Sequence, residues 1–173
     1  AELRAELEKK QASLQKHTST YSKMVEELKQ EISNKQIKIT ELNGSLNVRM
    51  NNKILFESGQ HKLNKEGLAV VEKIAKHLKG INDQTIRVEG HTDNVPIQTA
   101  RFPSNWELST ARATSVLKLL VEHSKISPDN FEAVGRSEFH SLNDNSTPEL
   151  RSQNRRIEIF LKPIKTIKDK TIN

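Results

Sequence analysis

The sequence predicts an α/β (α+β) sandwich in which a mixed sheet is covered by two main helices and preceded by a long N-terminal coiled-coil helix. Three observations support this prediction. Apolar residues recur every seven positions over residues 2–46, short alternating segments follow, and two amphipathic segments with capping signals lie between them. We therefore divide the 173 residues into a helical stalk over 1–45, a folded domain over 46–161 and a basic tail over 162–173.

The predicted stalk contains no proline and a single glycine, and its period of seven is unbroken. From Val25 onward the seam is apolar except for Lys35. β-Branched residues at one heptad position and leucine at the other favour a parallel two-stranded coiled coil, so we expect a parallel homodimer. The alternative is one amphipathic helix that packs on its own domain. One row of the seam comprises Leu7, Leu14, Tyr21, Leu28, Lys35 and Leu42, and the other comprises Arg4, Gln11, Thr18, Val25, Ile32, Ile39 and Leu46.

The first half of the folded domain is predicted to begin with two short strands, over 46–50 and 53–56, joined by a turn at Asn51-Asn52. Asn64 is a suitable N-cap for a helix that ends at Gly80. Residues 85–90 then alternate as a strand. The apolar stripe expected on the helix comprises Leu68, Val71, Ala75 and Leu78.

The second half begins with a capping box, Ser104 with Glu107, which predicts a helix running to about residue 122. A turn at 127–129 precedes a strand over 131–135, Pro148 begins a short helix, and residues 156–161 alternate as the last strand. The resulting order, β-β-α-β-α-β-(α)-β, places the two main helices on one face of a mixed sheet. The residues of the second main helix expected to face the core are Ala113, Val116, Leu117 and Leu120.

The composition excludes several classes of function. The absence of cysteine excludes disulfides, thiolate zinc sites and cysteine nucleophiles. The net charge is +6, but three of these charges lie in the tail and the domain is close to neutral, so nucleic acid is not an expected partner. No stretch is apolar enough to span a membrane, and residues 1–4 do not open a secretory signal. We expect a processed or truncated fragment whose anchor lies upstream.

Catalytic motifs are also missing. The sequence has no nucleophile elbow, dinucleotide-binding glycine motif or P-loop. His91 and Asp93 are two residues apart and have the chemistry of metal ligands, but a third ligand at a suitable spacing is lacking. We therefore expect no enzyme activity, no metal and no cofactor.

Polar residues do gather where strand ends meet helix starts. Asp93 follows the carboxyl end of a predicted strand, where open α/β sheets tend to bind ligands, and Arg112 lies two turns into the next helix. A carboxylate and a guanidinium that lie close together suit a zwitterion, with its ammonium on Asp93 and its carboxylate on Arg112. The alternative is that the two side chains pair with each other. Trp106 is expected to be a packing residue.

Three motifs in this region closely resemble the OmpA-like peptidoglycan-binding domain over residues 46–161. They are Gly90-His91-Thr92-Asp93-Asn94, Phe102-Pro103-Ser104-Asn105-Trp106-Glu107-Leu108-Ser109 followed by Arg112-Ala113, and Asn154-Arg155-Arg156-Ile157. Residues 101–109 are especially similar to the MotB-type branch, the stator subunit of the flagellar motor. Residues 54–59, with Leu63, resemble the family's entry strand.

The resemblance implies that the domain binds the peptide stem of peptidoglycan without covalent chemistry. In the family, the aspartate of the first motif binds the ammonium of diaminopimelate and the helix arginine binds its carboxylate, roles that fall on Asp93 and Arg112. The other positions that match residues lining or bracing the family's pocket are Thr92, Asn94, Asn105, Leu108 and Arg156. An alternative role for Arg155 or Arg156 is structural, joining the helix to the sheet.

The sequence thus indicates a peptidoglycan anchor on a dimeric stalk, held at a membrane in the periplasm or cell envelope by an upstream segment. Within this class, a flagellar stator subunit with a membrane channel partner is an alternative. A coiled-coil scaffold with a vestigial pocket is an alternative from another class, and a wall-degrading enzyme is a third.

Overall fold

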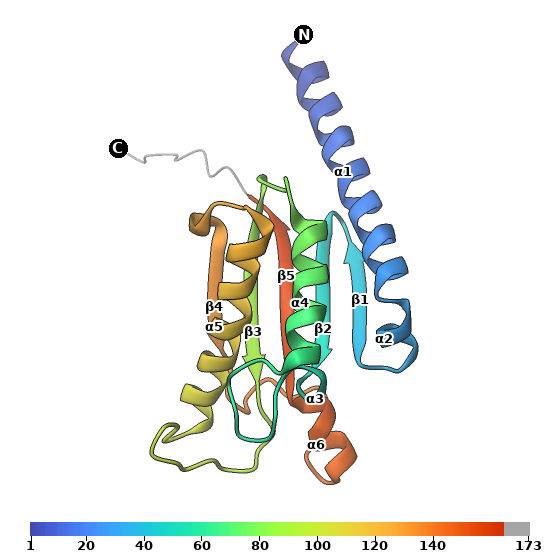
Figure 1. The fold of residues 1–173 in the computed structure, drawn as a ribbon. Helices are drawn as coiled ribbons and strands as arrows, with labels where there is room; N and C mark the ends of the chain where they lie inside the picture. The colour runs from blue at the N-terminus through green and yellow to red at the C-terminus, as the bar shows by residue number, and fades with distance from the viewer. Residues whose placement is uncertain (165–173) are drawn as a thin grey trace, which may run out of the picture.

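A mixed five-stranded sheet is the centre of the fold in the computed structural model, which describes residues 1–164 (Figure 1). The strand order is β1-β2-β5-β3-β4. β3 and β4 pair in parallel, and the other three pairs are antiparallel. The mixed sheet predicted from the sequence is therefore confirmed. The strands are β1 (Ile37–Leu42), β2 (Ser45–Asn51), β3 (Gln84–His91), β4 (Phe131–Gly135) and β5 (Arg156–Pro163).

Two long helices, α4 (Lys65–Leu78) and α5 (Asn105–Ser124), lie side by side over one face of the sheet, as predicted (Figure 1). Both begin at the predicted caps. The side chain of Asn64 accepts a hydrogen bond from the Gly67 amide at 2.7 Å, and that of Ser104 accepts one from the Trp106 amide at 3.2 Å. Such caps satisfy amides that have no partner within the helix.

The prediction that Leu68 belongs to the apolar stripe of α4 is wrong, because this side chain is 40% exposed. At 100° per residue, the set spaced i, i+3, i+4 and i+7 from Gly67 shares one face, and Leu68 lies beside that face rather than on it. The buried residues of α4 are Gly67, Val70, Val71, Ile74, Ala75 and Leu78.

The predicted strand over 53–56 is also wrong. Residues Asn52–Leu55 form a helical turn, α3, because the side chain of Asn51 accepts a hydrogen bond from the Lys53 amide at 2.9 Å and caps the turn. Ile54 and Leu55 are both buried, which a half-buried strand would not allow for consecutive residues. The remaining short elements are α2 (Lys29–Ser33), η1 (Pro128–Asn130) and α6 (Pro148–Asn154).

The N-terminal helix is present but shorter than predicted. α1 covers Glu2–Glu27, and residues Ile37–Leu42, predicted as part of the stalk, form the edge strand β1. The two residues between β1 and β2, Asn43 and Gly44, have φ angles of 51° and 76°. Two consecutive positive φ angles make a turn whose twist matches an antiparallel hairpin. The chain therefore reverses where the heptad pattern predicts continued helix.

The C-terminal half of α1 packs on the domain, whereas its N-terminal half projects beyond the sheet (Figure 1). Met24 and Leu28 are fully buried in the core. On the projecting part, Leu3 and Leu7 are more than half exposed, and Leu14, which lies beside the turn at Gly44, is half exposed. No helix within residues 1–164 combines the length and the hydropathy that crossing a bilayer requires. Of the predicted basic tail, residues 162 and 163 belong to β5, and 165–173 lie outside the described residues.

Candidate functional site

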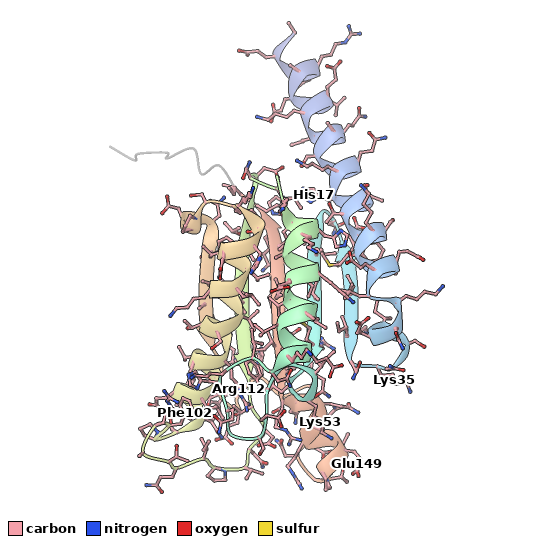
Figure 2. The ribbon with its side chains drawn as sticks, in the orientation of Figure 1. His17, Lys35, Lys53, Phe102, Arg112 and Glu149 are labelled. Atoms are coloured by element: carbon pink, nitrogen blue, oxygen red, sulfur yellow. The ribbon has the colours of Figure 1, made fainter. Side chains whose placement is uncertain are left out.

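A cavity of about 550 Å³ opens at the end of the domain opposite the free end of α1. Its walls are α3, the loop after β3, the first two turns of α5 and α6. Figure 2 shows Arg112 and Lys53, two of its charged residues, at this end of the molecule. The polar residues that line it include Asn52, Thr92, Asp93, Asn105, Arg112 and Arg155.

Asp93, the first predicted site residue, is 6% exposed and lies two residues after the end of β3. One carboxylate oxygen, Oδ1, accepts a hydrogen bond from the Val95 amide at 3.0 Å. The other, Oδ2, accepts one from Nη1 of Arg155. The carboxylate is thus held in place from both sides, and its charge partner comes from a segment 62 residues later in the chain.

Arg112, the second predicted site residue, is 5% exposed and is held by uncharged groups. Its Nε donates to the carbonyl oxygen of Gln60 at 2.8 Å, and its guanidinium carbon lies 5.1 Å from the centre of the Phe56 ring. Among the described residues no carboxylate oxygen lies within 4 Å of this guanidinium. Burial and the nearby charge of Arg155 lower the pKa of Arg112 to about 10, against the opposing effect of Asp93. Arg112 is therefore a buried cation at neutral pH.

The direct pair between Asp93 and Arg112, the alternative that the sequence left open, does not form in this structure. The carboxylate is paired with Arg155, and the Arg112 guanidinium has no counter-ion within the part of the chain that is described. A buried charge without a counter-ion is costly, and an anion that enters the cavity would offset this cost.

The backbone between the two residues is held by short polar contacts. The side-chain amide nitrogen of Asn105 donates to the carbonyl oxygens of Asp93, at 3.4 Å, and Val95, at 3.1 Å, which fixes the start of α5 against the loop. The hydroxyl of Thr92 donates to the carbonyl oxygen of Asp93 at 2.9 Å. Leu108, one turn before Arg112, is buried and lines the cavity. Thr92, Asn105 and Leu108 therefore lie where the sequence predicted.

A close approach of α5 to β3 sets the separation of the two site residues. A Cβ atom added to Gly90 would lie 2.1 Å from the carbonyl oxygen of Ser109, so a side chain at this position would push the helix away. Because Gly90 precedes Asp93 by three residues and Ser109 precedes Arg112 by three, this contact places both charged groups at the cavity.

The other two predicted site residues lie outside the cavity wall. Asn94 is exposed, and its amide donates to Oδ1 of Asn145 at 3.3 Å. Arg156 alternates along β5 with the core residue Ile157, so its side chain points to the other face of the sheet. There its Nε donates to Glu158 and its Nη2 to the carbonyl of His140. The cavity instead contains Arg155 and Arg151, which the sequence prediction of the site left out.

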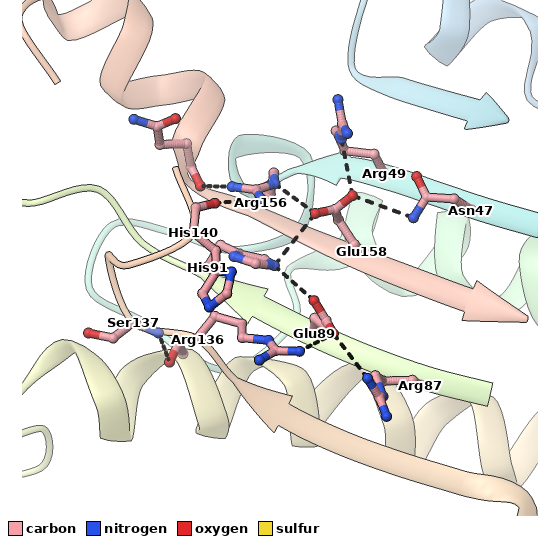
Figure 3. A network of polar contacts seen from close by, with 12 residues as sticks. Asn47, Arg49, Arg87, Glu89, His91, Arg136, Ser137, His140, Arg156 and Glu158 are labelled. Atoms are coloured by element: carbon pink, nitrogen blue, oxygen red, sulfur yellow. Dashed lines mark hydrogen bonds and ion pairs between the residues drawn. The ribbon is translucent and has the colours of Figure 1, made fainter. Parts of the chain in front are cut away.

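Arg156 belongs to a polar network on the sheet face opposite α4 and α5 (Figure 3). His91 Nε2 lies 3.4 Å from Glu89 and 3.5 Å from Glu158, and Arg136 donates to Glu89 at 2.9 Å. Burial opposes ionisation of Glu89, but the contacts with His91 and Arg136 prevail and lower its pKa to about 2. Burial lowers the pKa of His91. This network stabilises the sheet and does not line the cavity.

Similarity to known proteins is consistent with this geometry. Residues 55–155 match the OmpA family. Over 113 residues the chain is 42% identical to the uncharacterized protein YtxE of Bacillus subtilis, covering 65% of this chain and 46% of that protein. Over 116 residues it is 36% identical to motility protein B of the same organism, covering 67% and 44%. The chain thus spans less than half the length of these two relatives.

Two solved structures have the same fold. The cell wall anchor of the T6SS from Pseudomonas aeruginosa superposes with a TM-score of 0.74 at 31% identity, covering 82% of this chain and 97% of that one. A MotB-like protein from Desulfovibrio vulgaris superposes with a TM-score of 0.77 at 26% identity, covering 89% and 98%. Fold, motif order and family match agree, and the chain belongs to the OmpA family, with MotB homologues among its near relatives.

Proposed function

We propose that the domain binds the peptide stem of peptidoglycan without catalysis and thereby anchors an envelope protein to the cell wall. The observation that carries the proposal is the buried guanidinium of Arg112, which lies at a cavity without a carboxylate partner among the described residues. The free carboxylate of a diamino acid such as diaminopimelate would bind Arg112, and its ammonium would bind Asp93 beside Arg155. Thr92, Asn105 and Leu108 hold this arrangement.

The position of the cavity supports an anchoring role. It lies at one end of the domain, and α1 projects from the other, so a protein attached through α1 would hold the cavity away from its point of attachment (Figure 1). A relative of known structure is described as a cell wall anchor, and others as periplasmic domains of MotB. We place this protein in the periplasm or cell envelope on the same basis.

Binding by two charged contacts is expected to be modest. Hydrogen bonds to charged groups contribute about 1.5–3 kcal/mol each, so a single stem would bind weakly and reversibly. Such an affinity suits a reversible tether.

Co-sedimentation with purified diaminopimelate-type sacculi tests the proposal. The native chain should pellet, and Asp93→Asn and Arg112→Gln should stay in solution. Arg101→Gln is the matched control, since Arg101 is exposed and does not line the cavity. If all four proteins pellet alike, binding is non-specific charge attraction. If none pellets, the pocket does not bind peptidoglycan, and a scaffold role for the helix becomes the better explanation. Release of soluble muropeptides by the native chain would instead show a wall-degrading enzyme.

A flagellar stator subunit is the second candidate, favoured by the match to motility protein B and to MotB structures. Deletion of the gene distinguishes the two. Cells that assemble flagella but do not swim would indicate a stator with a membrane channel partner, whereas swimming cells with altered envelope integrity would indicate a general anchor.

A further inference from the structure

The charges around the cavity are unequal. Its lining contains four cationic side chains, Lys53, Arg112, Arg151 and Arg155, and a single carboxylate, Asp93. A site for one zwitterion needs one charge of each sign, and the pair formed by Asp93 and Arg155 already balances itself. Three cationic groups, Lys53, Arg112 and Arg151, are left without a carboxylate partner among residues 1–164.

Two of these three are well placed for an anion. Arg112 extends from α5 and Arg151 from α6, and both helices line the cavity. Arg151 is half-buried, and its Nη1 donates to the carbonyl oxygen of Asn145 at 2.9 Å, which orients the guanidinium. Within residues 1–164 no carboxylate oxygen lies within 4 Å of it. Lys53, from α3, is exposed at the rim.

The charge of Arg155 acts on both Asp93 and Arg112. It lies one helical turn after Arg151 and bonds Asp93, so Asp93 is flanked by cationic side chains from α5 and α6. The charge of Arg155 also lowers the pKa of Arg112, which means that the two guanidinium groups repel each other across the cavity. A ligand with excess negative charge would relieve this repulsion, whereas a neutral zwitterion would relieve only part of it.

We infer that the cavity contains a second anion subsite, formed by Arg151 with Lys53, which binds a second free carboxylate of the stem. The inference rests on the proposed function and specifies its ligand as a stem segment with at least two free carboxylates for each ammonium. That carboxylate belongs either to the residue before the diamino acid or to the main chain of the diamino acid, since its side-chain carboxylate is the one assigned to Arg112. An arginine fork binds a carboxylate through two parallel hydrogen bonds and has no comparable interaction with an amide.

Isothermal titration with synthetic stem tripeptides tests this inference on the whole chain. Three N-acetylated peptides are compared: one with all carboxylates free, one amidated on the residue before the diamino acid, and one amidated on the main-chain carboxylate of the diamino acid. The side-chain ammonium and carboxylate that are expected to bind Asp93 and Arg112 stay free in all three. The free peptide should bind about tenfold more tightly than one of the amidated peptides, because one charged hydrogen-bonded contact is lost. The peptide that loses affinity identifies the source of the second carboxylate.

Variants assign the effect to Arg151. Arg151→Gln should weaken binding of the free peptide about tenfold and abolish discrimination against the amide, whereas Arg151→Lys should retain part of both. Arg101→Gln removes the same charge outside the cavity and should leave both unchanged. If Arg151→Gln unfolds the loop at Asn145, the lysine variant still reports the charge effect, and the thermal midpoint of each variant reveals the unfolding.

Two contrary results have different meanings. If all three peptides bind the native chain equally, the second subsite does not exist, while the proposed function stands. If no peptide binds and the sacculi do not retain the protein, the proposed function fails and the subsite fails with it.

Discussion

At the scale of single residues, Gly90 determines where both charged groups of the cavity lie. Its α-carbon faces the backbone of α5 so closely that a methyl group would overlap the Ser109 carbonyl. Asp93 and Arg112 each lie three residues further along their segments. The geometry of the site therefore depends on a residue that does not line the cavity.

Replacing Gly90 with alanine should move α5 and weaken the site. Overpacking of this kind typically costs about 1–3 kcal/mol, so we expect urea unfolding to show a loss of about 2 kcal/mol or more. The affinity for a stem peptide with free carboxylates should also fall, measured on the fraction of the sample that is folded. Unchanged stability together with unchanged binding would show that α5 does not rest on β3 as described.

A second prediction concerns the pH dependence of stability. The pKa of Glu89 is about 2 in the folded protein and 4.5 ordinarily, so the unfolded chain binds this proton more readily. The contribution is fully present above about pH 4.5 and is lost as the pH falls from there to 2. It amounts to up to about 3 kcal/mol, since one pKa unit corresponds to about 1.4 kcal/mol. The lowered pKa of His91 acts in the same direction, beginning at its ordinary value of 6.5.

Denaturant unfolding at pH 7 and at pH 3 measures this effect. Glu89→Gln should lose stability at pH 7 and show a smaller drop on acidification than the native chain. Glu132→Gln, at an exposed position on β4, should keep the native drop. An equal drop in Glu89→Gln and the native chain would contradict the assignment.

The sequence predicts individual site residues where local rules suffice. Asp93 follows a strand, and Arg112 lies two turns into a capped helix, so their meeting follows from short segments and one packing contact. Whether Arg155 or Arg156 points to the cavity depends on which residues of β5 face each side of the sheet, because neighbouring strand residues point to opposite faces. Register is determined by pairing with β2 and β3, and a sequence motif does not show it.

At the scale of elements, the stalk shows how a helical pattern can extend over a hairpin. Ile39 and Leu42 fit the heptad seam, but Ile37 and Ile39 also alternate with Lys38 and Thr40, and Asn43-Gly44 is a strong signal for a two-residue hairpin turn. The strand prevails because Ile37 pairs opposite Met50 and joins the core, a burial that an extended helix would lose. The dipeptide is the signal that would have located the strand, but the prediction extended the stalk over it.

Alanine substitutions in β1 distinguish the two arrangements. Ile37 is 3% exposed and Leu42 is 69% exposed. Ile37→Ala should cost about 2–4 kcal/mol in urea unfolding, while Leu42→Ala should stay within about 0.5 kcal/mol of the native chain. In a coiled-coil stalk, Leu42 would be a seam residue and its loss would be the more severe. A larger loss of stability in Leu42→Ala than in Ile37→Ala would therefore support the longer coiled-coil helix and contradict β1.

At the scale of the whole molecule, the projecting helix and the cavity lie at opposite ends of the protein. α1 is 26 residues long and spans about 39 Å, and its C-terminal half is joined to the core through Met24 and Leu28. Any self-association through the helix would therefore use its N-terminal half, where Leu7 and the half-exposed Leu14 continue the seam that is buried further along. We propose that a parallel dimer forms there, which would hold two cavities near one polymer.

Such a dimer makes a weak site effective, and this is the last prediction. Linking two sites can raise apparent affinity for a polymer by about 100-fold or more without a new contact. Leu7→Lys with Leu14→Lys should therefore reduce retention by sacculi far more than affinity for a soluble stem peptide, which occupies one cavity at a time. Ala5→Lys with Ala12→Lys adds the same charge at the same spacing on the other side of the helix, where both residues are exposed, and should leave retention unchanged. Analytical ultracentrifugation would follow the mass of each variant. If the leucine variants are monomeric and still bind sacculi like the native chain, a single cavity suffices for anchoring and the projecting helix has another purpose.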